Sequence, residues 1–312
     1  MNTQKSINDK NAENSLRGKT IAIASGKGGT GKTTFAVNLF SIIAESVMLI
    51  DCDVEEPNCH LFLQSRTQQQ ETEISERFSV LIPEIDFGKC TGCRKCAQVC
   101  RYNAIVVIEK RPMLFEELCH NYGGCARHCP QNAIKEVPKE VASINVTRWR
   151  GKKFVYGLLD IGQARSSPVI GYLRKNYADK INNEYVLIDC PPGTSCPAVE
   201  AVRGVDLLVL ITEPTPFGLN DLELAIKMGI ALNLKQAVII NRADLGASDV
   251  KKMCNNYNIP IIGEIAFDKN IAGAYSRGKI ISDEIISFRT QCEQIWQKIK
   301  ILVSQQTEDT KQ

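Results

Sequence analysis

The chain has 312 residues, 44% of them hydrophobic, and a formal net charge of +3 from 38 basic and 35 acidic residues. This is enough apolar material for one large core, or for a large domain with a smaller one. The charge is balanced and forms no basic stripe with interleaved aromatic residues, so no nucleic-acid partner is predicted. The longest apolar runs are strand-sized, which predicts no stable membrane insertion.

Residues 1–19 are polar and lack the apolar region of a secretory signal. We interpret them as a disordered leader of a soluble, cytoplasmic protein, and residues 305–312 as a disordered tail. Thirteen cysteines are present, and seven of them fall between Cys90 and Cys129. An odd number, close clustering and the lack of a signal argue against disulfides and favour thiolates held for metal.

Apolar runs of strand length alternate with stretches of helical spacing on both sides of the cysteine-rich block. Such alternation predicts an α/β fold with a doubly wound, mostly parallel sheet. Residues 20–82 and 139–304 are predicted to form this domain, and residues 83–138 a small α+β insert on an edge loop whose ends lie close together. Residues 64–76 are predicted to be a surface loop. The expected strands are 20–25, 47–51, 185–189, 207–212, 237–241 and 259–265, and the expected helices are 31–45, 219–232, 248–255 and 283–303.

Residues 26–34 read G-K-G-G-T-G-K-T-T between the first strand and the first helix, which satisfies the phosphate-binding pattern G-x-x-x-x-G-K-[ST]. Glycines let backbone N–H groups wrap the phosphates at a helix N-terminus. Lys32 is expected to reach the β- and γ-phosphates of ATP, and the Thr33 hydroxyl to bind Mg²⁺. The nucleotide-binding set is Gly26, Gly28, Gly29, Thr30, Gly31, Lys32, Thr33 and Thr34.

Two further apolar strands end on carboxylates. Asp189 follows Y-V-L-I, the pattern of a Walker B strand, and is expected to hold Mg²⁺ through water. Asp51 ends the second strand and is expected to support the Mg²⁺ shell. The segment 191–194, P-P-G-T, is predicted to sense the γ-phosphate, because Gly193 permits close approach.

The cysteine block contains an internal repeat. Its first copy has the spacing C-x2-C-x2-C-x3-C, typical of bacterial ferredoxins, and the second copy follows 29 positions later with Tyr122 in place of one cysteine. In a two-cluster ferredoxin the fourth cysteine of each run binds the other cluster. One 4Fe-4S cluster is therefore assigned to Cys90, Cys93, Cys96 and Cys129, and an incomplete second site to Cys100, Cys119 and Cys125.

Phenolate is a poor substitute for thiolate, so the Tyr122 site is open to a 4Fe-4S cluster with one labile iron, a 3Fe-4S cluster, or no cluster. His120 is a conceivable substitute ligand, although it adjoins Cys119. Structural zinc is the competing interpretation of the whole block. The repeated third and fourth cysteines favour iron–sulfur.

Together these motifs resemble the MinD/ParA/nitrogenase-iron-protein class of P-loop ATPases, in the form that carries an inserted ferredoxin domain. The resemblance extends over residues 20–290 and includes D-C-D-V-E-E-P-N at 51–58 and G-L-L-D-I-G at 157–162. It implies an ATP-dependent homodimer in which Lys27 crosses to the partner's phosphates. It further implies that Asp53 orients the attacking water and that Asn241 contacts the base, with residues 214–216 beside it.

The resemblance implies an ATP-gated iron–sulfur protein that hydrolyses Mg-ATP and either transfers electrons or delivers a cluster to a client protein. One alternative is a MinD- or ParA-like positional switch in which the insert only docks partners. A cobyrinate amidase-type ligase is disfavoured, because no segment remains for a glutaminase domain. Cys196, which follows the 191–194 segment, is a candidate for a bridging metal or a packed thiol. Small apolar roles are expected for Cys52, Cys59, Cys190, Cys254 and Cys292.

Overall fold

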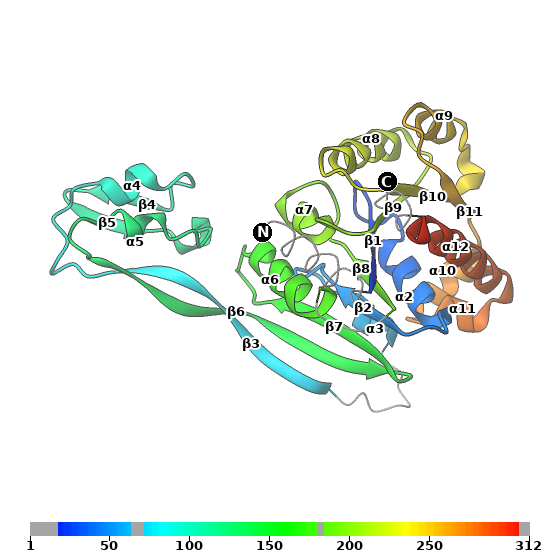
Figure 1. Ribbon diagram of the computed structural model, residues 1–312, viewed down its shortest axis with the longest axis horizontal. Helices are drawn as coiled ribbons and strands as arrows, with labels where there is room; N and C mark the ends of the chain where they lie inside the picture. Colours follow the sequence, from blue (N-terminus) through cyan, green and yellow to red (C-terminus); the bar gives the residue numbers. More distant parts are fainter. Residues whose placement is uncertain (1–17, 64–71, 180–183, 306–312) are drawn as a thin grey trace, which may run out of the picture.

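The computed structural model describes residues 18–63, 72–179 and 184–305, so the expected leader (apart from its last two residues) and almost all of the expected tail lie outside the described residues. A nine-stranded sheet dominates the body, in the order β11-β10-β9-β1-β8-β2-β7-β6-β3 (Figure 1). Neighbouring strands from β11 to β7 are parallel, and β7-β6 and β6-β3 are antiparallel. The strands of the parallel part are β1 (Lys19–Ala24), β2 (Val47–Asp51), β7 (Lys152–Leu159), β8 (Tyr185–Asp189), β9 (Leu207–Thr212), β10 (Gln236–Asn241) and β11 (Ile261–Ile265).

The central strands are continuous apolar runs because both faces of the sheet are covered. Every residue of β2 and of β9 is buried. The parallel register aligns Asp51 of β2 with Asp189 of β8, so the two strands place their terminal carboxylates at the same edge of the sheet. The predicted doubly wound α/β fold is confirmed, and each predicted strand matches an observed one to within two residues.

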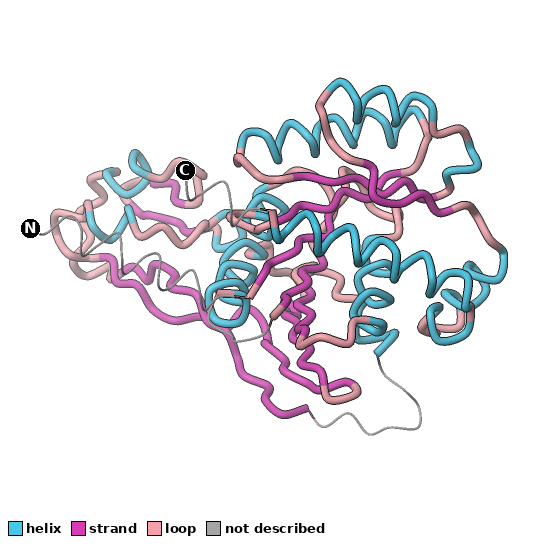
Figure 2. Tube along the Cα trace, turned by 45° about the vertical axis from the view of Figure 1, so that its right-hand side comes forward, coloured by secondary structure: helices cyan, strands magenta, loops and turns pink. Residues whose placement is uncertain are grey.

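Helices cover the two faces of the sheet (Figure 2). One core contains the apolar sides of α6 (Ser166–Leu173), α7 (Cys196–Val202), α8 (Pro216–Ala231) and α9 (Ser248–Asn256). The opposite core contains those of α2 (Lys32–Ile42), α3 (Cys59–Leu63), α10 (Lys269–Ser276), α11 (Ile281–Glu284) and α12 (Ile286–Ser304). Short segments η2 (Arg174–Ala178) and η3 (Ala243–Leu245) complete the body. The single helix predicted over 283–303 is broken at Ile285, which has extended backbone angles.

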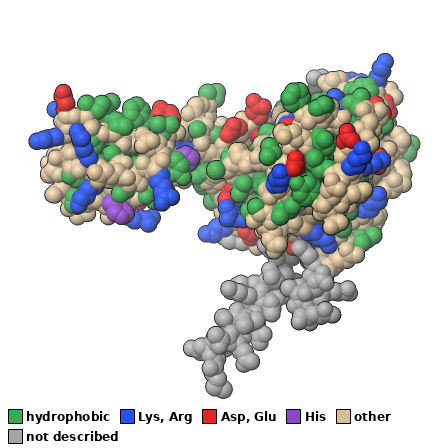
Figure 3. Space-filling view, turned by 90° about the horizontal axis from the view of Figure 1, so that it is seen from above, with side chains coloured by type: hydrophobic (Ala, Val, Ile, Leu, Met, Phe, Trp, Pro, Cys, Tyr) green, Lys and Arg blue, Asp and Glu red, His purple; other side chains and the backbone are tan. Residues whose placement is uncertain are grey.

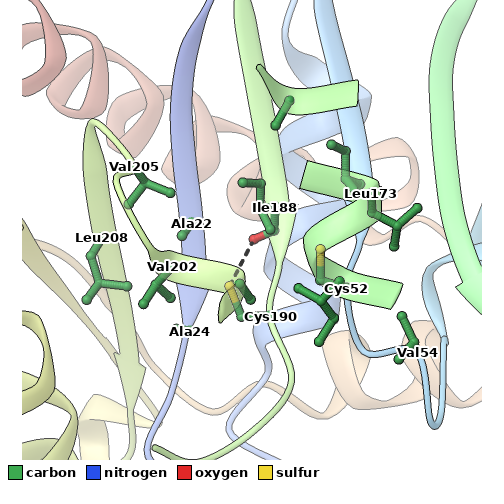
Figure 4. Packing of buried hydrophobic residues seen from close by; sticks show 14 of the residues in the cluster. Ala22, Ala24, Cys52, Val54, Leu173, Ile188, Cys190, Val202, Val205 and Leu208 are labelled. Atoms are coloured by element: carbon green, nitrogen blue, oxygen red, sulfur yellow. Dashed lines mark hydrogen bonds between the residues drawn. The ribbon is translucent and has the colours of Figure 1, made fainter. Parts of the chain in front are cut away.

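The five cysteines expected to be packed are all buried. Cys52 and Cys190 lie among aliphatic side chains of the first core (Figure 4). Cys196, in contrast, is exposed at the start of α7. No described helix is both long and apolar enough to span a bilayer.

The chain leaves and re-enters the body through two long paired strands at one edge of the sheet (Figure 1). These are β3 (Thr72–Ile85) and β6 (Ile134–Trp149), and Pro83 pairs with Glu136. The expected loop over 64–76 is wrong for residues 72–76, because this segment pairs with β6. Residues 64–71 lie outside the described part. The sequence prediction also missed β6 and β7, whose alternating exposure lacks the continuous apolar run of the central strands.

The cysteine-rich segment forms a small lobe at the end of this two-stranded ribbon (Figure 1). It contains α4 (Lys95–Val99), β4 (Ile105–Ile108), β5 (Arg111–Leu114), η1 (Glu116–Leu118) and α5 (Gly124–Arg127). The repeat is visible in the backbone, because Arg94 and Gly123 precede α4 and α5 with φ of 66° and 71°. Cys96, Ile105 and Ile134 form a separate small core, so the lobe does not share the cores of the body.

Candidate functional sites: a nucleotide cleft and a thiol-rich lobe

The phosphate loop joins β1 to α2 at the carboxyl edge of the sheet. Gly31 precedes α2 with a φ of 98°, a left-handed conformation that strains other residues. A Cβ on Gly31 would lie 2.9 Å from Nδ2 of Asn241. Asn241, at the end of β10, donates a 2.9 Å hydrogen bond to the carbonyl of Thr30. The structure therefore brings Asn241 against the loop itself.

Thr33 and Asp189 meet at the base of this loop. The Thr33 hydroxyl donates a 2.6 Å hydrogen bond to Oδ2 of Asp189, and Oδ1 of Asp189 is buried without a partner among the described residues. Burial raises the pKa of Asp189. A hydroxyl and an unpaired buried carboxylate oxygen are the hard oxygen donors that Mg²⁺ prefers. The residues therefore fit the predicted Mg²⁺, which Thr33 and Asp189 would hold.

Asp51 and Asp53 face different surroundings, although both belong to the same short segment. Asp51 is fully buried and accepts hydrogen bonds from the N–H groups of Asp53, Asn58 and Cys59. It anchors the loop 52–58, which we name the switch loop. Ligand atoms of Asp51, Cys59 and Asp189 lie within 4.8 Å of one another, so Asp51 lies beside the predicted Mg²⁺ site. Burial, followed by the negative charge of Asp189, raises the pKa of Asp51.

Asp53 lines the open cleft beside the phosphate loop, where an attacking water would enter. Burial, followed by the negative charge of Asp189, raises the pKa of Asp53 to about 6. Among the described residues, no backbone N–H group donates to the carboxyl group of Asp53, in contrast to that of Asp51. The geometry places Asp53, and not Asp51, where it can contact a bound substrate.

The cleft has a volume of about 520 Å³ and extends from the phosphate loop to α10. Phosphate-loop residues and Asp53 line one end. The other end contains apolar residues that the sequence analysis missed: Ile265, Ala266, Phe267, Ile271 and Tyr275. They lie at the end of β11 and after it, at the carboxyl edge of the sheet. Open α/β sheets bind ligands at this edge, so their position was a usable signal. Residues 214–216, expected beside the base, are not among the residues that line this cleft.

Lys32 and Lys27, the two lysines of the phosphate loop, differ in position. Lys32 is buried and lines the cleft. Lys27 is about one-third exposed, and its Nζ lies 3.8 Å from Oε2 of Glu213, with Arg242 3.4 Å from the other oxygen. Glu213 follows β9, so the single chain pairs Lys27 with the segment between β9 and α8, and Lys27 is not among the residues that line the cleft. Gly193, with a φ of 88°, donates a 2.9 Å hydrogen bond to the carbonyl of Ser25 and so lies against the loop.

The lobe places the predicted cluster ligands in two separate cavities. Cys90, Cys93, Cys96 and Cys129 all line one cavity, although Cys129 comes from the second repeat. The N–H of Ala133 donates to Sγ of Cys129 at 3.3 Å, and that of Ala104 donates to Sγ of Cys100 at the same distance. Such N–H groups stabilise negative sulfur. Four thiols in one cavity fit a thiolate-bound cluster.

Cys100, Cys119, Cys125 and Tyr122 line the second cavity. The Tyr122 hydroxyl donates to the carbonyl of Val99 at 3.1 Å, so its O–H group is already engaged. His120 also lines this cavity, and its ring stacks on that of Tyr102 with centroids 3.7 Å apart. The structure brings together three thiols here, with a phenol at the fourth position.

Comparison with known proteins places this chain in a family. The model of the CobQ/CobB/MinD/ParA nucleotide-binding domain matches residues 21–281. The chain belongs to this family. An uncharacterized protein of Methanocaldococcus jannaschii is 30% identical over 261 residues, which cover 83% of this chain and 90% of that protein. The match therefore spans both parts of the body and the lobe between them.

Three further similarities are more distant. The iron-sulfur cluster carrier protein of Aquifex aeolicus is 22% identical over 84% of this chain and 61% of its own length. The cell division ATPase MinD of Pyrococcus furiosus has a TM-score of 0.55 at 19% identity, with 91% of this chain and 99% of that chain covered. A variant of Cyanothece McdA in complex with ATP has a TM-score of 0.52 at 16% identity, with 92% and 97% covered. These structures show the fold.

Proposed function

We propose that this protein is a dimeric Mg-ATPase whose nucleotide state controls an iron–sulfur lobe. The observation that carries the proposal is the pair of thiol-lined cavities on a lobe attached to a MinD-like nucleotide cleft. The last cysteine of each repeat lines the cavity of the other repeat, as the ferredoxin assignment requires. Residues 83–138 would form the cluster-binding domain, and residues 20–82 and 139–304 the ATPase domain.

The ATPase part follows from the roles of the cleft residues. Backbone N–H groups and Lys32 would hold the phosphates, with Thr33 and Asp189 at Mg²⁺. Asp53 would orient the attacking water, and Lys27 would reach the partner's phosphates after leaving Glu213. Asn241 and the apolar end of the cleft at Phe267 would border the base.

The spacing of the thiols supports iron–sulfur over zinc. Zn–S bonds of about 2.3 Å bring the sulfurs of a tetrahedral site within about 4 Å of one another. Among the described residues, no three cysteine sulfurs of the lobe lie within 4.8 Å of one another. A larger group fits this wider arrangement better than a single ion.

The bound cluster would supply one-electron chemistry, or would itself be the cargo passed to a client protein. Electron transfer and cluster delivery are both compatible with the lobe, because one cavity has four thiols and the other has three with Tyr122. We assign the stable cluster to the four-thiol cavity and a labile 4Fe-4S or 3Fe-4S cluster to the other.

A positional switch like MinD or ParA is the second candidate function, favoured by the fold shared with Pyrococcus furiosus MinD. Membrane attachment in such a switch requires an unpartnered amphipathic helix. The apolar side of α12, including Phe288, Trp296 and Ile299, is buried against the body. This helix is therefore engaged in the fold.

Iron and zinc analysis with low-temperature EPR on protein purified without oxygen tests the proposal. We expect about four to eight irons per chain. Cys93→Ser should remove most of the stable cluster signal, Cys125→Ser should affect only the labile signal, and Cys196→Ser on the body should leave both unchanged. Zinc without iron in the wild-type protein would refute the iron–sulfur assignment and favour the positional switch.

A further inference from the structure

A short loop, residues 160–165, connects β7 to α6 and lies between the switch loop and the lobe. Arg165, at its end, is only 4% exposed. Its guanidinium donates hydrogen bonds to the carbonyl oxygen of Glu116, to that of Cys119 at 3.3 Å, and to Oε1 of Gln163. Glu116 and Cys119 belong to the lobe, so Arg165 joins the body to the segment that carries a predicted cluster ligand.

The next residue contacts the nucleotide side. The hydroxyl of Ser166, the first residue of α6, donates to Oε1 of Glu55 in the switch loop. The N–H of Leu159, just before the 160–165 loop, donates to the carbonyl of Val54 at 2.8 Å. The switch loop also contains Asp53, which lines the nucleotide cleft. Adjacent residues therefore bind the switch loop and the lobe.

From these contacts we propose that Arg165 and Ser166 couple the nucleotide state of the cleft to the second thiol set. The proposal rests on the proposed function, because it names the residues through which ATP would act on the lobe. Movement of the switch loop around bound ATP pulls on Ser166 through Glu55. Arg165 moves with Ser166, because the two residues are adjacent in the chain. Its hydrogen bonds to Glu116 and Cys119 then shift the backbone of residues 116–119.

The chemistry of the Arg165 contacts suits this role. Its three acceptors, two backbone carbonyls and one amide, are neutral, so its positive charge stays uncompensated by them. A guanidinium also donates in several directions at once, which a lysine ammonium cannot reproduce with the same planar geometry. Arg165 is thus a positioning residue for the second thiol set.

Hydrogen–deuterium exchange on the full chain, with and without a non-hydrolysable ATP analogue and Mg²⁺, tests the coupling. In the wild-type protein we expect the analogue to slow exchange at the phosphate loop and to change exchange at residues 115–123. Arg165→Gln and Ser166→Ala should retain the first effect and lose the second. Ser167→Ala and Arg150→Gln are matched controls, because Ser167 adjoins the contact and Arg150 pairs with Asp283 elsewhere; both should behave as wild type.

The outcomes separate the coupling from the cluster. An analogue effect at the phosphate loop with no effect at residues 115–123 in the wild-type protein would overturn the coupling, whatever the iron content. Retention of the second effect in Ser166→Ala, which leaves Arg165 in place, would refute the path through Glu55. If the wild-type protein contains no iron but the analogue changes exchange both at the phosphate loop and at residues 115–123, the coupling is supported and the cluster assignment is refuted. Absence of any effect at the phosphate loop would overturn the coupling and the proposed ATP binding, whatever the iron content.

Discussion

At the scale of single residues, Lys27 is the group whose position differs most from its expected role. In the single chain it pairs with Glu213, which also pairs with Arg242. Glu213 is largely buried, so this ion pair is less screened than a surface pair. If Lys27 moved to a partner's phosphates, it would exchange the carboxylate of Glu213 for another anion. The free-energy cost of breaking the Glu213 pair would therefore be offset on dimer formation.

We predict that Lys27→Ala abolishes ATP-dependent dimerisation while the monomer still binds nucleotide through Lys32. The measurement is light scattering coupled to size exclusion, with Mg-ATP present, together with a nucleotide-binding titration. Lys252→Ala, on the exposed side of α9, is the matched control and should dimerise normally. Normal dimerisation of the Lys27→Ala protein would contradict the trans role.

At the scale of elements, the phosphate loop is held in place by close backbone contact with α8. A Cβ on Gly26 would lie 2.1 Å from the carbonyl oxygen of Asp221, whereas a Cβ on Gly28 would meet nothing within 4 Å. The first glycine of the loop is therefore required by packing, in addition to any contact with phosphate.

We predict that Gly26→Ala lowers the free energy of unfolding by about 1–3 kcal/mol, because α8 or the loop must move to admit the methyl group. Chemical denaturation monitored by circular dichroism measures this loss. Gly28→Ala is the matched control, and its stability should stay close to wild type. Equal stability of the two variants would show that the Gly26 contact is not a packing constraint.

At the scale of the whole molecule, the lobe stands apart from the sheet on the ribbon of β3 and β6. Lys and Arg side chains are scattered over the surface of the lobe that Figure 3 shows. Its small core around Cys96, Ile105 and Ile134 is separate from the two cores of the body. The ribbon ends where Ile85 pairs with Ile134, so the chain could turn back at that point.

We predict that replacing residues 86–133 by a two-residue Asn-Gly turn leaves the body folded, because that turn suits an antiparallel pair. Arg165 would lose its lobe acceptors and be solvated by water instead. Thermal unfolding and the rate of ATP hydrolysis are the measurements, and neither should fall greatly relative to the full chain. Collapse of the unfolding transition would show that the lobe is required for the fold of the body.

The sequence alone determined strands β1, β2 and β8 to β11 of the sheet, the position of the phosphate loop and the grouping of the thiols. Buried parallel strands are continuous apolar runs, and β2 and β8 end at the predicted aspartates. The cysteine spacing is a local constraint, and the repeat places Cys129 with the first three cysteines. Ligation by these thiols and the roles of Asp53 and Asn241 stay predictions.

Only the tertiary structure decided which distant segments meet. Glu213 holds Lys27, Phe267 and Tyr275 line the end of the cleft, and Arg165 contacts the lobe. The contacts of Lys27 and Arg165 have no local sequence signature, because each depends on how sheet order and the long ribbon bring separate loops together. Strands β6 and β7 were likewise missed, since a sheet edge exposed on one side lacks the apolar run of its centre.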